Sequence, residues 1–235
     1  MIKFDVLNRF TGSVQFTAEI ECKEDEITSI KLGLAVKWAI KARANLAGAN
    51  LEGANLARAN LARANLARAY LAGAYLAGAY LARANLEGAN LARANLARAN
   101  LARANLEGAN LARANLEGAN LEGAYLARAN LEGAYLEGAY LAGAYLAGAY
   151  LEGANLEGKK LIGKRPILQI GGIGSRNDYL ISYMTEDGIK IKTGCFSGSL
   201  DEFEAAVHKE HDDNEHGKEY AAAIQMIKVH AEIRK

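Results

Sequence analysis

The chain is poor in the residues that support a disulfide framework or a membrane span. Its 235 residues include only two cysteines, Cys22 and Cys195, and one proline, Pro166. Two cysteines near opposite ends of the chain fit a reducing compartment better than a disulfide scaffold. The sequence also shows no amino-terminal apolar segment of the signal-peptide kind and no uninterrupted apolar run of membrane-spanning length. We therefore expect a cytoplasmic protein without a membrane partner.

An excess of one charge is also missing. Lysine and arginine number 28 against 27 acidic residues. This near balance provides no overall field that would attract nucleic acid or an anionic membrane, so a polar partner has to be met by a local patch. Hydrophobic residues make up 51% of the chain, which is enough for one sizeable domain or for an elongated core with caps.

The middle of the sequence repeats every five residues. Leucine recurs at every fifth position from Leu46 to Leu156, which gives 23 consecutive units, and Leu161 continues the series. Each unit reads Ala, then Asn or Tyr, then Leu, and ends in Ala-Gly, Glu-Gly or Ala-Arg. Self-similarity at a fixed period is typical of repeat architectures, in which each unit buries its apolar side chains against its neighbours.

A period of five suits neither an α-helix nor a flat strand. On a helix, successive leucines would turn by roughly 140° and spread around the cylinder, and on a strand the odd period would send them to alternate faces. An alanine-rich helix is the alternative, but glycine ends most units that lack arginine, and each glycine costs up to about 1 kcal/mol in a helix interior. We therefore expect a coil in which five residues form one side and turn a corner. Every Leu, and the Ala two residues before it, then points to a central axis.

The units resemble those of the pentapeptide-repeat family, as in Ala44-Asn45-Leu46-Ala47-Gly48. The resemblance covers about half of the chain. It implies a β-solenoid, namely a right-handed quadrilateral parallel β-helix with four pentapeptides per coil, and the spacing alone gives neither the handedness nor the four sides. On this basis residues 44–163 form the repeat region, with nearly six coils and a length of roughly 28 Å at the spacing of neighbouring strands.

Residues 1–43 are not repetitive, and we expect them to cap the first coil. Two expected strands, Ile2–Leu7 and Val14–Glu21, flank a turn-rich stretch and form a β-hairpin. A helix follows through about Ala42, with Thr28 or Ser29 as its cap, although alternating apolar residues leave a strand open for this segment. Residues 8–12 and the helix leading into the repeats resemble the leader of phage and prophage members of the family.

Residues 164–235 are expected to form a small α+β domain that closes the last coil. Its expected strands are Ile167–Ile170, Tyr179–Thr185 and Ile189–Lys192, and the last two are joined at Asp187-Gly188, a strong hairpin signal. Ser199 and Glu202 form a capping-box pattern at the start of a helix. The residues expected on the apolar faces of two amphipathic helices are Phe203, Ala206 and Val207, then Tyr220, Ile224, Ile227 and Ala231.

Few residues are candidates for chemistry, and all of them lie in this carboxy-terminal segment. His208, His211 and His216, with Cys195, match no standard zinc spacing and lie among charged residues typical of a solvated linker. The glycine-rich residues 171–175 are similar to a phosphate-binding loop, but a strand follows them instead of the required helix. Cys195 with a distant His lacks a visible third partner for nucleophilic catalysis. We therefore expect no catalytic residue, no metal and no cofactor.

The variable positions of the repeat face outward. Arginine occupies ten unit-end positions, counting Arg43 directly before the first unit, glutamate occurs in nine units, and arginine is concentrated before about residue 113. Residues twenty apart stack if four units make a coil, so one column holds Arg43, Arg63, Arg83 and Arg103. This column is either a ladder able to contact phosphates or a solvated face. Outward tyrosines ring two coils and act either as interface anchors or as a stacked cover; they are Tyr70, Tyr75 and Tyr80, then Tyr135, Tyr140, Tyr145 and Tyr150.

The sequence favours a non-enzymatic structural and interaction scaffold with an unidentified protein partner. The alternatives are a nucleic-acid-binding module using the arginine column, a DNA-mimic that interacts with gyrase, and an enzyme housed in residues 164–235. The gyrase-binding branch of the family mimics the acidic surface of a DNA duplex, whereas these repeats contain no Asp and balance Glu with Arg. We therefore expect no tight binding to nucleic acid. The restricted residue alphabet leaves two origins open, consensus design or recent duplication.

Overall fold

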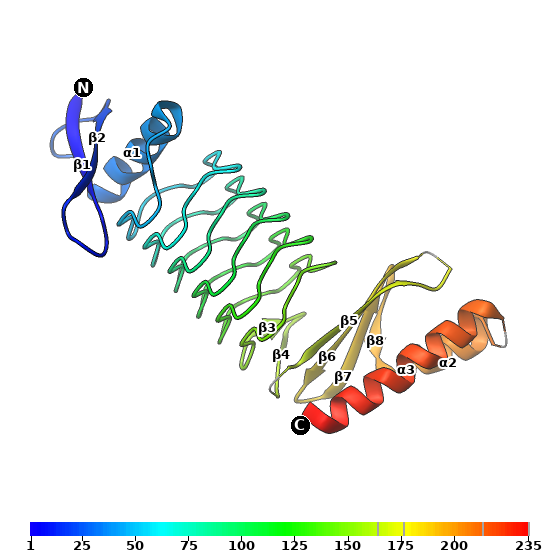
Figure 1. The fold of residues 1–235 in the computed structure, drawn as a ribbon. Coiled ribbons are helices and arrows are strands. Elements are labelled where there is room, and N and C mark those ends of the chain that lie inside the picture. The colour runs from blue at the N-terminus through cyan, green and yellow to red at the C-terminus, as the bar shows by residue number, and fades with distance from the viewer. Residues whose placement is uncertain (164, 176, 213, 235) are drawn as a thin grey trace. The chain divides into compact units, whose positions relative to one another are not determined.

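The computed structural model describes residues 1–163, 165–175, 177–212 and 214–234 (Figure 1). Its internal contacts divide the chain into two compact units, Met1–Tyr150 and Leu151–Lys235. The first unit holds the amino-terminal segment and most of the repeats. The second holds the last repeat residues together with the carboxy-terminal domain.

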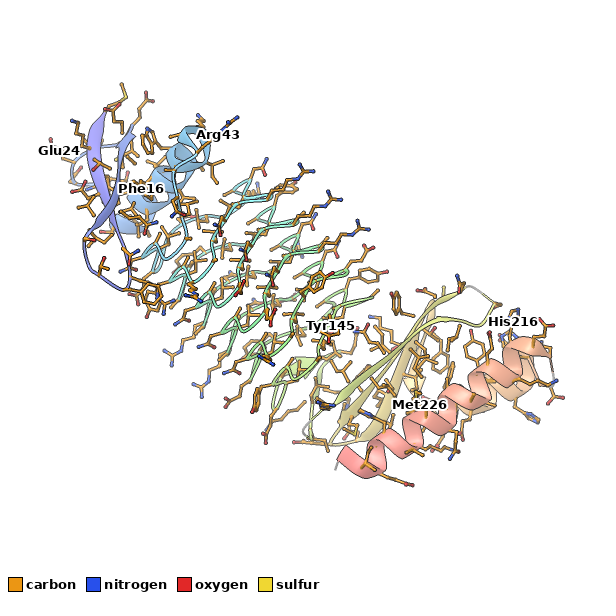
Figure 2. The ribbon with its side chains drawn as sticks, viewed as in Figure 1. Phe16, Glu24, Arg43, Tyr145, His216 and Met226 are labelled. Atoms are coloured by element: carbon orange, nitrogen blue, oxygen red, sulfur yellow. The ribbon has the colours of Figure 1, made fainter. Side chains whose placement is uncertain are left out.

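The amino-terminal segment is a β-hairpin followed by a helix. Strands β1 (Ile2–Leu7) and β2 (Val14–Ile20) pair in antiparallel fashion, and α1 spans Thr28–Ala42. The helical prediction is thus confirmed over the strand alternative. The predicted cap is wrong, because the N-cap residue is Ile27, without a side-chain hydrogen bond. Phe16 lies on β2 beside α1 (Figure 2). Its ring stacks on that of Trp38 in α1 with the centroids 6.1 Å apart, so the hairpin and the helix share an apolar interface.

The repeats pair with one another at a fixed offset of twenty residues. Parallel bridges join Asn50 to Tyr70 and continue in the same way up to Asn130 and Tyr150. From Leu51 to Leu131, the backbone N–H of each central Leu donates to the next coil, as from Leu51 to the carbonyl of Tyr70 at 2.7 Å. Four pentapeptides therefore form one coil. We number the coils 1 to 6 from residue 44, so that coil 1 is residues 44–63 and coil 6 is residues 144–163.

The interior of the coils consists of leucine and alanine. Every central Leu from Leu46 to Leu161 is buried except Leu146, which is half-buried, and the Ala that precedes each one by two residues is buried from Ala49 onward. The predicted inward positions are confirmed. Burial of each Leu side chain stabilises the fold by about 1.5 to 3 kcal/mol, and together these terms offset the ordering of the backbone.

Each corner is a tight turn whose third residue is left-handed. The N–H of Ala54 donates to the carbonyl of Leu51, and Gly53 between them has a φ of +64°. Nine units place Arg at this same position, and with Arg43, directly before the first unit, these arginines have φ between 55° and 61°. A left-handed L-residue costs roughly 1 to 2 kcal/mol, so these arginines adopt a conformation that suits glycine.

The Asn of each unit closes a local hydrogen bond that Tyr cannot make. The Oδ1 atom of Asn100 accepts from the N–H of Ala102 at 3.0 Å. The same bond recurs for the Asn at this position in every unit except that of Asn155, whose Oδ1 is buried without a hydrogen-bond partner. Asparagine therefore stabilises the turn, whereas tyrosine gives up this bond and places a ring on the surface.

The amino-terminal segment is bonded to the edge of coil 1. The N–H of Asn50 donates to the carbonyl of Leu7 at 2.7 Å, and that of Asn55 donates to Ser29 of α1 at 2.8 Å. A Cβ added at Gly33 of α1 would lie 2.0 Å from the carbonyl oxygen of Asn55, so the helix backbone lies directly against the coil. These bonds give the exposed strand edge partners, as a cap requires.

The carboxy-terminal unit combines a four-stranded antiparallel sheet with two helices. The sheet has the order β5 (Ile167–Ile173), β6 (Asp178–Thr185), β7 (Gly188–Thr193) and β8 (Phe196–Ser199). Helices α2 (Leu200–Glu210) and α3 (Glu215–Arg234) cover one face of it (Figure 1). The core between sheet and helices includes Leu180, Ile191, Phe203 and Ile227. The α+β character and the capping box at Ser199 are confirmed.

Three details of this unit differ from the sequence prediction. Strand β8 was not predicted, because its residues Phe196–Ser199 include glycine and two serines. The hairpin between β6 and β7 turns at Glu186 and Asp187, since Gly188 already pairs with Thr185. A short hairpin of β3 (Asn155–Leu156) and β4 (Lys159–Lys160) ends the repeats.

The last repeat residues join this sheet directly. Leu161 forms a bridge to Thr185, and the N–H of Ile162 donates to the carbonyl of Met184 at 3.1 Å. Two ion pairs link the same segments, an exposed one from Lys159 to Asp187 and a partly buried one from Lys192 to Glu157. Among the residues that the structure describes, no helix is long and apolar enough to cross a membrane.

Candidate functional site

The arginine column predicted from the sequence lies along one corner of coils 1 to 3. The N–H of Arg63 donates to the carbonyl of Ala82 and that of Arg83 to Ala102, each at 3.0 Å, so these corners lie on successive rungs. Arg103 follows at the same corner, and its N–H donates to Glu122. Arg43 precedes the column as the C-cap residue of α1. All four side chains are exposed.

Neither Arg43 nor any of the nine repeat arginines forms an ion pair within the part of the chain that the structure describes. Arg43 and Arg63 line one hollow of about 440 Å³ between the end of α1 and coil 1, together with Ile40 and Asn65. Among the described residues, no ion pair engages the guanidinium groups of this column. This fits an anionic partner, because Arg presents several donors in a rigid fork that matches carboxylate and phosphate groups.

The four carboxy-terminal tyrosines place one aromatic side chain on each of the four sides of the coil. The bridge partners of Tyr135, Tyr140, Tyr145 and Tyr150 are residues 115, 120, 125 and 130, which lie on four successive units. Each of the four side chains is more than half exposed. Within the described residues, Tyr145 (labelled in Figure 2) is the one of the four with a ring neighbour. That neighbour is Tyr125, and the two ring centroids lie 6.5 Å apart. The ring is therefore an exposed girdle and not a stacked cover.

The amino-terminal tyrosines behave differently from one another. The guanidinium of Arg9 lies 5.3 Å from the ring centroid of Tyr70 and donates to the carbonyl of Arg68. The amino-terminal segment therefore covers the Tyr70 ring through a cation–π contact. Tyr75 and Tyr80 are both more than half exposed. The sequence had grouped these three residues, and it gave no signal that Arg9 would cover one of them.

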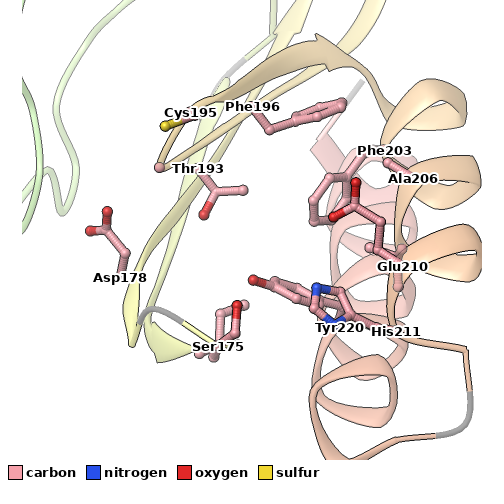
Figure 3. Close-up of a pocket in the computed structure, with 13 residues that line it drawn as sticks. Ser175, Asp178, Thr193, Cys195, Phe196, Phe203, Ala206, Glu210, His211 and Tyr220 are labelled. Atoms are coloured by element: carbon pink, nitrogen blue, oxygen red, sulfur yellow. The ribbon is translucent and has the colours of Figure 1, made fainter.

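The carboxy-terminal unit contains a cavity of about 410 Å³ between the loop ends of its sheet and helices α2 and α3 (Figure 3). A row of aromatic contacts forms one wall, from Phe196 to Phe203 at 5.1 Å, then to Tyr220 and to His211 at 5.5 Å each. Polar residues also line it, among them Ser175, Asp178, Thr193 and Glu210. This volume is within the range of small-molecule pockets.

Cys195 and His211 both line this cavity, but at opposite sides of it. Figure 3 shows the Cys195 sulfur beside β7 and the His211 ring against Tyr220 on the helix side. A nucleophile and its base need hydrogen-bond reach, and this arrangement does not place the two groups together. His208 instead faces Asp212, with Nδ1 3.0 Å from a carboxylate oxygen. In the described ranges, no three His, Cys, Asp or Glu side chains gather closely enough to hold a metal.

The glycine-rich loop is explained by packing. A Cβ added at Gly174 would lie 1.9 Å from the Tyr220 hydroxyl oxygen, and one at Gly171 would lie 2.7 Å from the Tyr179 ring. The N–H of Gly174 donates to the Glu219 carboxylate at 2.8 Å, so this amide is not available for a phosphate. These glycines allow two tyrosines to approach the backbone.

Comparison with known proteins identifies the repeats. The model of the pentapeptide repeats matches in eight copies over residues 42–158. Through this region the chain belongs to the pentapeptide-repeat family. A comparison with curated proteins finds no significant match.

Several solved structures of pentapeptide-repeat proteins are similar to the repeat region. HetL from the cyanobacterium Nostoc sp. strain PCC 7120, a protein involved in heterocyst differentiation regulation, is 43% identical over 48% of this chain and 53% of its own, with a TM-score of 0.47. Rfr23 from the cyanobacterium Cyanothece 51142 is 36% identical over 48% of this chain and 91% of its own, also at 0.47. QnrB1, a plasmid-mediated fluoroquinolone resistance protein, is 20% identical over 47% of this chain and 66% of its own, with a TM-score of 0.36. The chain thus spans about half the length of HetL.

Proposed function

We propose that this pentapeptide-repeat protein is a non-enzymatic interaction scaffold whose repeats form a right-handed quadrilateral β-helix. The proposal rests on the difference between the interior and the outer surface of the coils. The interior of the coils is leucine and alanine, whereas the outer surface presents unpaired arginines and exposed tyrosines. Tyr and Arg are the residues that most often anchor protein interfaces. A cytoplasmic location is part of the proposal.

The exposed girdle gives the proposal its first test. Wild-type protein is compared as bait with a Tyr135→Ser, Tyr145→Ser double variant and with a Tyr75→Ser, Tyr80→Ser double variant as matched control. Captured proteins are identified, purified and titrated against all three forms. The proposal expects a partner that the wild type and the control bind at least tenfold more tightly than the girdle variant. Equal binding by all three forms would contradict the girdle as the binding surface.

A second candidate function, nucleic-acid binding, is favoured only by the unpaired arginine column. Four phosphate contacts would give a salt dependence of log K with a slope near −0.9 per contact, and without base contacts the binding is weak. The test compares duplex DNA binding at about 150 mM salt for the wild type and for an Arg63, Arg83 and Arg103 triple alanine variant. The scaffold proposal expects no sub-micromolar binding by either form, and tight binding lost in the triple variant would replace it.

A further inference from the structure

One column of the repeat region has a central row of polar residues between two charged corners. Bridges stack the row in the order Asn60, Tyr80, Asn100, Asn120 and Tyr140. We call this surface, with the corners that precede and follow it in the chain, the tyrosine face. Tyr80 and Tyr140 are exposed by 57% and 51%, so both rings are available for a partner. All of these residues lie in the first compact unit.

Both corners of the tyrosine face carry an arginine in coil 3 and a glutamate in coil 4. At the preceding corner the N–H of Arg98 donates to the carbonyl of Glu117 at 2.7 Å, and at the following corner Arg103 donates to Glu122 at 2.8 Å. The rungs that carry these charges are therefore adjacent. None of the four side chains forms an ion pair within the described residues.

This pattern is complementary to itself after a half-turn. Consider a twofold axis that crosses the tyrosine face between Asn100 and Asn120, at right angles to the stack. It exchanges coil 3 with coil 4 and coil 2 with coil 5 of a second copy that runs in the opposite direction. Because both copies have the same rung spacing, of about 4.8 Å, the charges stay in register.

Under this operation every marked residue meets a suitable partner. Arg98 meets Glu117 of the second copy, and Arg103 meets Glu122 of the second copy. Tyr80 meets Tyr140 of the second copy, which allows offset or edge-to-face ring contacts. Each pair occurs twice, as an isologous interface requires. We propose that the tyrosine face binds a second copy of this chain in antiparallel orientation.

The next face along the chain, with the row Asn65, Asn85, Asn105, Tyr125 and Tyr145, does not share this property. In the same register, its corner would bring Arg68 against Arg128, and Glu87 against Glu107, which are like charges. The face of Asn110 and Asn130 becomes complementary only after a shift by one coil, and it then offers no tyrosine pair, since Asn90 would meet Tyr150. It serves as the control surface, through Arg113 and Arg128.

The interface is small. The part of its central row that pairs with the second copy, from Tyr80 to Tyr140, occupies four coils, about 19 Å in height, and its width is that of three to four extended residues, about 10 to 13 Å. Such an area lies below the roughly 1,200 Å² of standard interfaces. We therefore expect a weak dimer with a dissociation constant between about 10 μM and 1 mM at low salt, weakened further at high salt because exposed ion pairs are screened.

Sedimentation equilibrium of the full chain from about 10 μM to 1 mM, at about 50 mM and 500 mM salt, tests the proposal. The Arg98→Glu, Arg103→Glu variant should dissociate at least tenfold more readily, because like charges then meet. Adding Glu117→Arg and Glu122→Arg to it should restore the dimer, since the exchange recreates every pair. The Arg113→Glu, Arg128→Glu variant has the same net charge change and should dimerise like the wild type. Circular dichroism verifies that each variant is folded.

Three outcomes would overturn the proposal: a wild type that remains monomeric up to about 1 mM, an exchange variant that does not recover, or a control variant that loses the dimer equally. The inference rests on the proposed function in using the same outer surface. Its failure is nevertheless distinguishable, because the girdle variant of the partner assay changes Tyr135 and Tyr145, which lie outside the tyrosine face, and the dimer is tested by charge variants that leave every tyrosine in place.

Discussion

The side chain of Arg98 lies over Gly118 of the next coil, and a Cβ added at Gly118 would lie 3.4 Å from the Arg98 Cγ atom. The same relationship, at the same distance, links Arg68 with Gly88 and Arg103 with Gly123. The aliphatic stem of a corner arginine therefore covers the glycine one coil further on. A substitution at this glycine is therefore expected to cost stability for two reasons, the positive φ and the contact of the new Cβ with the arginine stem.

Gly108 and Gly118 allow the effect of the positive φ and the effect of the arginine contact to be measured separately. Gly108 and Gly118 both have a φ of +62°, but nothing lies within 4 Å of a Cβ added at Gly108. Gly108→Ala should lower the free energy of unfolding by about 1 kcal/mol through backbone strain alone. Gly118→Ala should cost measurably more in urea denaturation, and in an Arg98→Ala background the difference should vanish. Equal costs in the wild-type background would show that the stem does not pack there.

Leu101→Ala tests the inward direction of the leucines. Leu101 is fully buried, and the cavity left by its truncation should lower the free energy of unfolding by about 2 to 5 kcal/mol. Leu146→Ala is the matched control, because Leu146 is only half-buried, and its cost should be smaller. A loss well under about 1 kcal/mol at Leu101 is incompatible with an inward leucine.

Gly33→Ala tests the docking of α1 on coil 1. In an isolated helix this change is favourable by up to about 1 kcal/mol. Here the new Cβ would lie 2.0 Å from the Asn55 carbonyl oxygen, so the helix has to shift and the bond from Asn55 to Ser29 has to lengthen. We expect a lower melting temperature and faster amide exchange at Asn55. A higher melting temperature would mean that α1 does not contact the coil at Gly33.

The capping box of α2 predicts a pH effect. The backbone N–H of Ser199 donates to the Glu202 carboxylate at 2.6 Å, and this bond, with a further one from the Ser199 side chain, lowers the pKa of Glu202 below its ordinary value. A lowered folded-state pKa contributes stability above the unfolded-state pKa, and that contribution is lost as pH falls through the folded value. Ser199→Ala should raise the pKa of Glu202 in a carboxyl NMR titration, and leave that of Asp187 unchanged. An unchanged Glu202 pKa would contradict the cap.

The interior of the repeats could be predicted from the sequence because a strict period fixes which residues share an axis. The twenty-residue stacking needed the family resemblance in addition, since spacing alone does not give the number of sides. The left-handed arginines were missed, although Arg and Gly alternate at one unit position and could have revealed them. The hydrogen bonds between the amino-terminal segment and coil 1 could not be predicted from the sequence. They join backbone groups, which every residue has, so no residue type marks them.

The candidate sites were less accessible to sequence reasoning. The column of Arg63, Arg83 and Arg103 followed from the period, but the absence of ion pairs depends on side-chain directions. The carboxy-terminal cavity depends on residues as distant in sequence as Ser175 and Tyr220, brought together by the sheet and α3. The roles of Gly171 and Gly174 depend on the positions of Tyr179 and Tyr220, which pack against them in the folded chain.

The bridges between residues twenty apart also constrain how such a gene can change in length. A duplication or loss of twenty codons within the repeats adds or removes one whole coil, so every downstream residue keeps its column. A slip of five codons moves every downstream residue to the next column, which divides the arginine column and separates Tyr80 from the row of Tyr140. Unequal recombination in steps of one coil therefore preserves the surface, and smaller steps rewrite it while leaving the leucine interior intact.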